Sequence, residues 1–361
     1  MADVVVQADK LTELTKLICM RAGSDDAEAQ MVADRLVEAN LAGHDSHGVG
    51  MMPAYISAVV EGRLSIGQHA DVVVDKGCFL LIDGNAGYGQ VIAHEATEMG
   101  IAKAREHGVA VVGLRNSHHI GRIGAWGEMC ADAGFVSIHY VNSTSYHALV
   151  APFGGSDARY TTNPYCTAIP ATKDHPRLIL DMATSNIAMG KVRVAHNKGV
   201  EVPDGSLIDE KGNPTNDPGV MFPGDGEPTG ALMSVGAHKG YGLALICDIL
   251  AGGVTGGGTF LPERLERGTI INNMLMIILD PDVFNASDFF GQDLNAFTDW
   301  VKASPPAPGV EAVMVPGDPE RKMRDKRLAD GVPIDATTWQ ELLDTAQMAG
   351  VNRVEVEEFA A

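Results

Sequence analysis

The sequence of 361 residues predicts an α/β fold with a mixed sheet and a separate helical domain. Two observations support this prediction. Short apolar runs typical of strands alternate with helix-like stretches through the middle of the chain, and both ends of the chain have helical patterns. The length is also about twice that of a typical single domain. We therefore predict a helical domain from residues 1–75 together with 288–361, and an α/β domain from residues 76–287.

The first sixty residues are predicted to be helical. Leu11, Leu14 and Ile18 recur at helical spacing, and the polar run Ser24-Asp25-Asp26 can cap a second helix. A third helix is expected after Pro53, because proline is favoured in the first turn of a helix.

The middle of the chain is predicted to alternate strands and helices. Apolar runs of strand length, several closed by turn residues, indicate the strands. These runs are DVVVD (71–75), CFLLID (78–83), VAVVGL (109–114), FVSIHYV (135–141), RLILDMA (177–183) and MLMIILD (274–280). Helices are expected over residues 91–107, 121–133 and 239–251.

Beyond Pro281 the pattern is again mainly helical. Helices are expected over 287–303, 319–329 and 336–349, with a strand-like run at Glu311 to Val315. The Pro- and Gly-rich stretch from Pro203 to Gly230 is predicted to be a long loop or flap.

Composition and charge exclude several classes of partner. Hydrophobic residues make up 45% and charged residues 20%, as in a folded globular protein, and the net charge is −20. Such a charge repels nucleic acid and anionic lipid surfaces, so we expect neither as a partner. The five scattered cysteines contain no C-x-x-C pair, and no signal peptide or long apolar run is visible. These features predict a cytoplasmic protein.

Four of the twelve histidines lie in two short segments bounded by glycines. His44 and His47 occur in GHDSHG, and His118 and His119 occur in RNSHHIG, directly after the predicted strand VAVVGL. Histidine is the usual general acid or base near neutral pH, so these segments favour a catalytic site. The alternative is that each histidine is a surface or capping residue.

A metal site is the second interpretation of the same histidines, because His44-x-x-His47 resembles ligand spacing. It has little support. No H-E-x-x-H motif occurs, and two adjacent histidines on an extended segment point in opposite directions. We therefore predict no metal.

Nucleotide binding of the Rossmann type is not indicated, since no G-x-G-x-x-G follows a predicted strand and no phosphate-binding loop motif is present. The stretch His238-Lys239-Gly240-Tyr241-Gly242 opens a predicted helix, where a cation and free backbone N–H groups can hold a phosphate. The alternative is that this segment is a glycine-rich helix start whose lysine is exposed to solvent and binds no ligand.

At these residues the sequence resembles the type-2 malate/L-lactate dehydrogenase family, which includes ureidoglycolate, sulfolactate, diketogulonate and hydroxycarboxylate dehydrogenases. The resemblance covers almost the whole chain and is carried by seven blocks in order. These are DSHGV (45–49) with Tyr55, NSHHIG (116–121), TNP (162–164), DMATS (181–185), GKV (190–192), HKGYGL (238–243) and VPGD (315–318).

The resemblance implies a non-Rossmann dinucleotide-binding fold of the sulfolactate dehydrogenase type and a homodimer with active sites near the subunit interface. By position it makes His119 the general acid/base, which gives a proton to the carbonyl oxygen of the substrate. It makes His47 the second catalytic imidazole, which either polarises or orients that oxygen or donates the proton itself. It implies NAD or NADP as cofactor. The cofactor contacts carry over to Ser143, Asn163, Asp181, Met182, Ala183, His238, Lys239, Gly317 and Asp318.

One departure from the family pattern bears on the substrate. Many members carry an arginine two residues after S-H-G-V that suits a substrate carboxylate, whereas this chain has Gly50 and Met51. We expect Arg122 to replace that arginine, Met51 and Met52 to make the pocket more apolar, and Tyr55 and His44 to complete the substrate site. This pattern is most similar to the hydroxycarboxylate dehydrogenase branch.

The predicted substrates are therefore 2-oxo and 2-hydroxy acids of the phenylpyruvate or hydroxypyruvate type. Four alternatives stay open: malate or L-lactate dehydrogenase proper, a reductase of cyclic imine carboxylates, a catalytically silent nucleotide-binding protein, and a zinc hydrolase that uses His44, His47 and His119.

Overall fold

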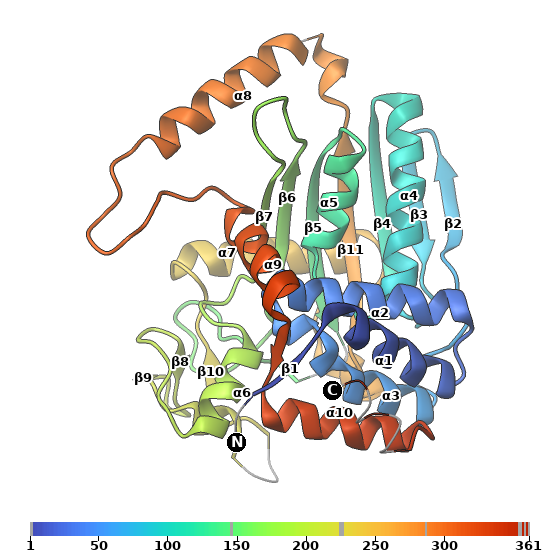
Figure 1. Cartoon of the computed structure of the whole chain (residues 1–361), viewed down its shortest axis with the longest axis vertical. Helices are drawn as coiled ribbons and strands as arrows, with labels where there is room; N and C mark the ends of the chain where they lie inside the picture. Colours follow the sequence, from blue (N-terminus) through green and yellow to red (C-terminus); the bar gives the residue numbers. More distant parts are fainter. Residues whose placement is uncertain are drawn as a thin grey trace.

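A computed structural model describes residues 3–144, 147–223, 227–285 and 287–352, together with Val356 and Phe359. Its centre is a mixed sheet with the strand order β2-β3-β4-β11-β5-β6-β7 (Figure 1). Only β3 and β4 are parallel neighbours, because α4 crosses over between them. The strands are β2 (Asp71–Lys76), β3 (Phe79–Asp83), β4 (Val109–His118), β5 (Val136–Thr144), β6 (Tyr165–Ile169), β7 (Leu178–Met182) and β11 (Ile271–Leu279). The mixed α/β class predicted from the sequence is confirmed.

Two helices cover one face of this sheet, namely α4 (Gly89–His107) and α5 (Gly124–Asp132) (Figure 1). Alternate strand residues point to these helices and form the main apolar core, among them Leu80, Val112 and Met276. On the opposite face, α7 (His238–Asp248) packs against β5, and the Asn142 amide donates to the Asp248 carboxylate at 2.7 Å.

A second core joins the two ends of the chain. It is formed by α1 (Ala8–Arg21), α2 (Asp26–Leu41), α3 (Met52–Val60) and α10 (Ala336–Met348). As predicted, the Asp25 side chain caps α2 by accepting a hydrogen bond from the Glu28 backbone at 2.9 Å.

A short antiparallel pair, β1 (Val4–Val6) with β12 (Val332–Ile334), ties the two ends together directly and was not predicted. Strand β2, which contains residue 75, belongs to the seven-stranded sheet. The proposed two-part division of the chain stays a prediction.

The stretch from Pro203 to Gly230 is not only a loop, as far as the structure describes it; residues 224–226 lie outside the described part. It contains β8 (Leu207–Ile208), which pairs with both β9 (Pro214–Thr215) and β10 (Ala231–Leu232) in a small sheet, and a 3₁₀ turn at Pro218–Met221. Two-residue strands leave no alternating pattern in a sequence, which is why the loop prediction was wrong here.

The remaining helices are α6 (Met189–Lys198), α7 (His238–Asp248), α8 (Ser287–Lys302) and α9 (Asp318–Asp330), with a π-helical turn at Ile249–Val254 and 3₁₀ turns at Pro262–Arg267 and Pro281–Phe284. Helix α8 stands apart from the sheet (Figure 1). The strand predicted at Glu311 to Val315 is wrong, because this apolar run has no neighbouring strand to pair with. Instead, the backbone N–H of Val315 donates to the Asp318 carboxylate at 3.0 Å.

Candidate active site

Three side chains from separate parts of the sequence meet where β4 ends. The Nδ1 atom of His119 lies 2.6 Å from the hydroxyl oxygen of Tyr55 in α3. The ring of His47, from the 3₁₀ turn Asp45–His47, stacks on the His119 ring with centroids 5.5 Å apart and planes 23° apart. Ser46 Oγ lies 3.0 Å from Nδ1 of His47. Among the described residues neither Nε2 atom has a hydrogen-bond partner, so both are available to a substrate.

Buried backbone contacts fix the His119 segment. Gly89, at the start of α4, lies so close that a Cβ there would be 2.2 Å from the His119 carbonyl oxygen. On the other side, the Ile120 backbone N–H donates to Asn272 Oδ1 at 2.9 Å, and that of Asn116 donates to Asn273 Oδ1 at the same distance. The loop is therefore held from α4 and from β11 at once.

Burial keeps both catalytic candidates neutral. It lowers the pKa of His47 to about 4, and the nearby His44 and Arg122 lower the pKa of His47 further. Burial also holds the pKa of His119 well below its usual value, with contributions from His47 and His118. A neutral imidazole can donate or accept a hydrogen bond at an oxygen without introducing charge.

Tyr55 is fully buried, and the structure places it beneath His119 rather than at an exposed surface. Its hydroxyl oxygen also accepts a hydrogen bond from Gln90 Nε2 in α4 at 2.8 Å. Of the two methionines expected at the pocket, Met52 is fully buried in the core of the chain ends, whereas Met51 keeps partial exposure in the 3₁₀ turn Val49–Met51. The prediction that Met52 lines the pocket is therefore wrong, because its side chain packs inward.

Arg122 is buried close to the histidines. Its Nη2 donates to Glu128 Oε2 at 2.7 Å, whereas Nε and Nη1 have no partner among the described residues. Asp181 lies on the other side of the same loop, where its carboxylate accepts the Gly124 N–H at 2.7 Å. Burial raises the pKa of Asp181, although Arg122 partly offsets this rise. His44, which is half-buried, has its Nε2 atom 3.4 Å from Glu320 Oε1.

The residues expected to contact a cofactor mostly lie at one end of β5, β6 and β7. The strand register aligns Tyr140, Tyr165 and Met182, which places Ser143, Asn163, Asp181 and Ala183 at this same end. Asn163 is buried, and its amide donates to the Ala244 carbonyl in α7 at 3.1 Å. The neighbouring Thr184 links the Thr162 carbonyl to the Val235 N–H through its backbone.

This end of β5, β6 and β7 forms a rim. Helix α7 begins there with His238 and Lys239, both of which are exposed. Lys239 has no ion-pair partner among the described residues. A Cβ at Gly240 would lie 2.1 Å from the Val235 carbonyl oxygen, so only glycine allows this close turn. An unpaired cation at a helix N-terminus suits a phosphate, and the residues present therefore fit a dinucleotide.

Gly317 and Asp318 lie apart from this rim, beside the first half of β7. The Ile179 N–H donates to the Pro316 carbonyl at 3.2 Å, and Gly317 has the positive φ of 94° that favours glycine. The Asp318 carboxylate pairs with Lys302 at 3.0 Å and with Arg321 at 2.5 Å. Asp318 therefore stabilises the start of α9 through these two ion pairs.

Sequence reasoning missed Gln90 and the asparagine pair Asn272 and Asn273. A signal for the pair existed, because two adjacent amides interrupt an otherwise apolar strand. Gln90 lies in an ordinary helical pattern and left no such signal.

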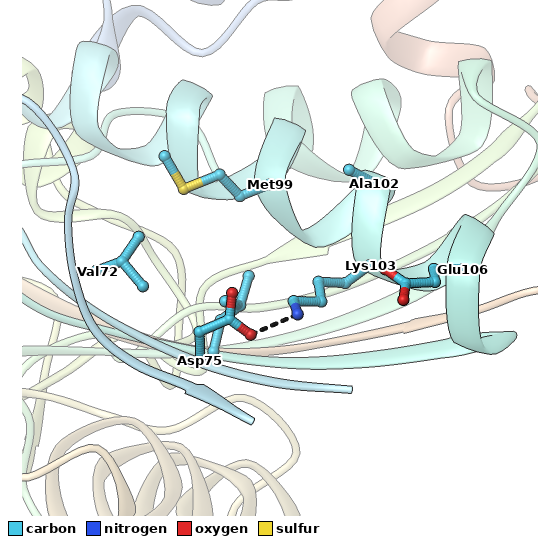
Figure 2. Close-up of a pocket in the computed structure, with 7 residues that line it drawn as sticks. Val72, Asp75, Met99, Ala102, Lys103 and Glu106 are labelled. Carbon is cyan, nitrogen blue, oxygen red and sulfur yellow. Dashed lines mark hydrogen bonds and ion pairs between the residues drawn. The ribbon is translucent and has the colours of Figure 1, made fainter. Parts of the chain in front are cut away.

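A hollow elsewhere, between β2, β3 and α4, is not part of this site. It contains the ion pair of Lys103 with Asp75 (Figure 2). Lys103 is thirteen residues beyond Gln90 on α4, about 20 Å along the helix axis.

The described residues contain no group of three His, Cys, Asp or Glu side chains placed to hold a metal ion. Within the same part of the chain, no helix has the length and apolar character needed to cross a bilayer.

Comparison with known proteins identifies the family. Residues 6–343 match the family model described as malate/L-lactate dehydrogenase. Hydroxycarboxylate dehydrogenase B of Escherichia coli O157:H7 is 46% identical over 98% of this chain and 96% of its own length. L-lactate dehydrogenase of Cupriavidus necator is 40% identical over 90% of this chain and 91% of its own length.

Solved structures agree with this result. A putative malate/lactate dehydrogenase from E. coli has a TM-score of 0.93 and 45% identity, with 98% of each chain covered. Sulfolactate dehydrogenase from Methanocaldococcus jannaschii has a TM-score of 0.83 and 31% identity over 97% of this chain and 99% of that one.

The fold thus defines a dehydrogenase of the non-Rossmann, sulfolactate dehydrogenase type. The chain belongs to the malate/L-lactate dehydrogenase family. It is an oxidoreductase of CH–OH donors, and the family implies a nicotinamide cofactor.

Proposed function

We propose that this protein interconverts 2-oxo acids and 2-hydroxy acids with NAD or NADP, and that His119 moves the proton. The observation that carries the proposal is the stacked pair of His119 and His47, each with one ring nitrogen engaged inside the protein and one left for substrate. The nicotinamide supplies or accepts the hydride at C2. During reduction His119 gives the proton on its substrate-facing ring nitrogen to the oxygen and is reprotonated from solvent, and the same steps run in reverse during oxidation, while His47 orients the same oxygen.

Arg122 is the proposed anchor for the substrate carboxylate. Its unpartnered Nε and Nη1 atoms are buried donors that an incoming carboxylate would satisfy, and Arg122 lies close enough to lower the pKa of His47. With Met51 in place of a second cation, the pocket suits an apolar or small side chain at C3, as in phenylpyruvate or hydroxypyruvate. His44, which contacts Glu320, is proposed to lie at the edge of the same pocket.

The cofactor is proposed to lie along the rim formed by Ser143, Asn163 and Asp181 to Ala183, with its phosphates at His238 and Lys239. Gly317 and Asp318 are proposed to support this rim from behind β7, through the contact of Pro316 with Ile179. The five cysteines are free, which fits the reducing cytoplasm.

A second copy of the chain is the proposed partner. In α8, Phe297 is 64% exposed and Trp300 is 78% exposed, and the part of the α7 region that the structure describes exposes Ile249 and Val254 as well. Clustered exposed apolar side chains mark protein interaction sites, so these side chains are the proposed contacts with a second copy. In size-exclusion chromatography with light scattering detection, we expect the wild-type protein to elute as a dimer. The double variant Phe297→Glu, Trp300→Glu is expected to elute as a monomer. A monomeric wild type would contradict this assignment.

The assay that tests the function measures the loss of NADH and NADPH absorbance at neutral pH. The panel is phenylpyruvate, hydroxypyruvate, pyruvate, oxaloacetate and a cyclic imine carboxylate. Turnover of an oxo acid is expected, with phenylpyruvate or hydroxypyruvate ahead of oxaloacetate. Turnover of the imine alone would replace the proposal with imine reduction. Cofactor binding without any turnover would support a silent nucleotide-binding protein.

A further inference from the structure

The Tyr55 hydroxyl connects His119 to the interior of the protein, and its hydrogen bonds have a definite direction. A tyrosine hydroxyl has one proton to donate. Gln90 Nε2 is a donor and lies 2.8 Å from the Tyr55 oxygen, so that oxygen accepts from Gln90. The described residues offer the hydroxyl proton one acceptor, which is His119 Nδ1 at 2.6 Å.

This direction fixes where His119 carries its own proton. A ring nitrogen that accepts a hydrogen bond is unprotonated, so a neutral His119 must carry its proton on Nε2. That is the nitrogen without a protein partner, next to the stacked His47 ring. The reverse arrangement would need a second acceptor for the tyrosine proton, and Gln90 presents its N–H₂ group at that point rather than its oxygen.

We propose that Tyr55, held by Gln90, is a positioning residue that fixes His119 as the Nε2-protonated tautomer and points this N–H at the substrate oxygen. The inference deepens the proposed function and rests on it for its catalytic consequence. The role of Tyr55 is positional because its side chain is fully buried and its hydroxyl bonds His119 Nδ1 and Gln90 Nε2. A ketone oxygen would then meet a hydrogen-bond donor before hydride transfer begins.

The direct test is the tautomer itself. We would label the full-length protein with ¹⁵N-histidine, record two-bond ¹H–¹⁵N spectra at neutral pH, and assign His119 by its loss in His119→Asn. The wild type is expected to show a protonated Nε2 and an unprotonated Nδ1. Tyr55→Phe is expected to move both nitrogen shifts toward each other as the two tautomers mix. A wild-type His119 protonated on Nδ1, or unchanged shifts in Tyr55→Phe, would overturn the proposal.

Kinetics supply the second readout. Tyr55→Phe is expected to lower kcat about tenfold with the KM for the cofactor unchanged, because one oriented hydrogen bond is lost. Tyr88→Phe is the matched control: Tyr88 is also fully buried, its ring lies 6.1 Å from that of Tyr55, and the structure records no hydrogen bond from it to His119. An equal loss of kcat in both variants would show a packing effect and overturn the positioning role.

The two levels of the proposal fail in different ways. If the wild type reduces no 2-oxo acid while His119 carries its proton on Nε2, the proposed function is wrong and the tautomer assignment stands. If the wild type is active and the Tyr55→Phe spectrum is unchanged, the function stands and the positioning role is wrong.

Discussion

The inner side of His119 and the rim at the start of α7 are built in opposite ways. On the inner side, Tyr55, Gln90 and Asn272 are buried, and each makes a hydrogen bond that holds the His119 segment. At the rim, His238 and Lys239 are exposed. The side chains of the first region are held by hydrogen bonds inside the protein, whereas those of the second face solvent.

This contrast separates what mutations in the two regions should do. Proton transfer depends on placement within fractions of an ångström, so changes on the inner side should lower turnover. A solvated cation contributes to binding through screened attraction, so changes at the rim should affect cofactor affinity instead.

The largest effect is expected for His119→Asn. Asparagine can still hydrogen-bond a substrate oxygen but cannot exchange a proton near neutral pH, so kcat should fall about 10²- to 10⁴-fold. Cofactor affinity, measured by fluorescence titration with NADH, should stay at the wild-type value because the rim is unchanged. Turnover close to wild type would remove His119 as the acid/base.

A smaller effect is expected for Asn272→Ala. This variant removes the acceptor of the Ile120 N–H and leaves that buried donor unpaired, which costs about 1–3 kcal/mol of unfolding free energy. Because Ile120 follows His119, kcat should fall while cofactor affinity is kept. Urea unfolding and steady-state kinetics measure the two effects. Asn186→Ala is the control, since the Asn186 side chain is exposed and bonds only the Gly205 carbonyl. Equal losses in both variants would contradict the proposed coupling.

Local sequence patterns can point to the rim but not to the contacts on the inner side. Lys239 and Gly240 could be recognised because a cation and small residues at a helix start have a local meaning. Likewise, the helix cap at Asp25 and the buried strands follow from neighbouring residues. Tyr55 and Gln90 meet His119 only after α3, α4 and β4 have packed together, so no local pattern assigns them to it. Local patterns also fail to predict the pairing of β1 with β12, because these two strands lie at opposite ends of the chain.

Acid should weaken the folded state through the buried histidines of the interior. Burial lowers the pKa of His118 to about 3, and burial lowers the pKa of His139 to about 3 as well. An unfolded histidine has a pKa near 6.5, so between these values the unfolded chain binds more protons and the free energy of unfolding falls as pH falls. Each such histidine contributes a slope of about 1.4 kcal/mol per pH unit.

Variants can assign this slope to one residue. His139→Gln should reduce the slope of unfolding free energy against pH by the contribution of one histidine between pH 6 and pH 4. Urea unfolding at several pH values measures this slope. His69→Gln is the control: the exposed His69 pairs with Glu95, which raises the pKa of His69, so its removal should leave the slope below pH 6 unchanged. An unaltered slope in His139→Gln would mean that His139 does not contribute.

The smallest effect is expected at the rim, for Lys239→Met. An exposed charge contributes up to about 1 kcal/mol, so affinity for NADH or NADPH should fall about fivefold while kcat at saturating cofactor is kept. Raising the salt concentration should narrow the gap between variant and wild type, because the lost attraction is one that salt screens. Lys326→Met, at an exposed lysine of α9, supplies the matched charge control. If Lys239→Met lowered kcat as strongly as the inner variants do, the rim would take part in the chemistry, and the division between the two regions would fail.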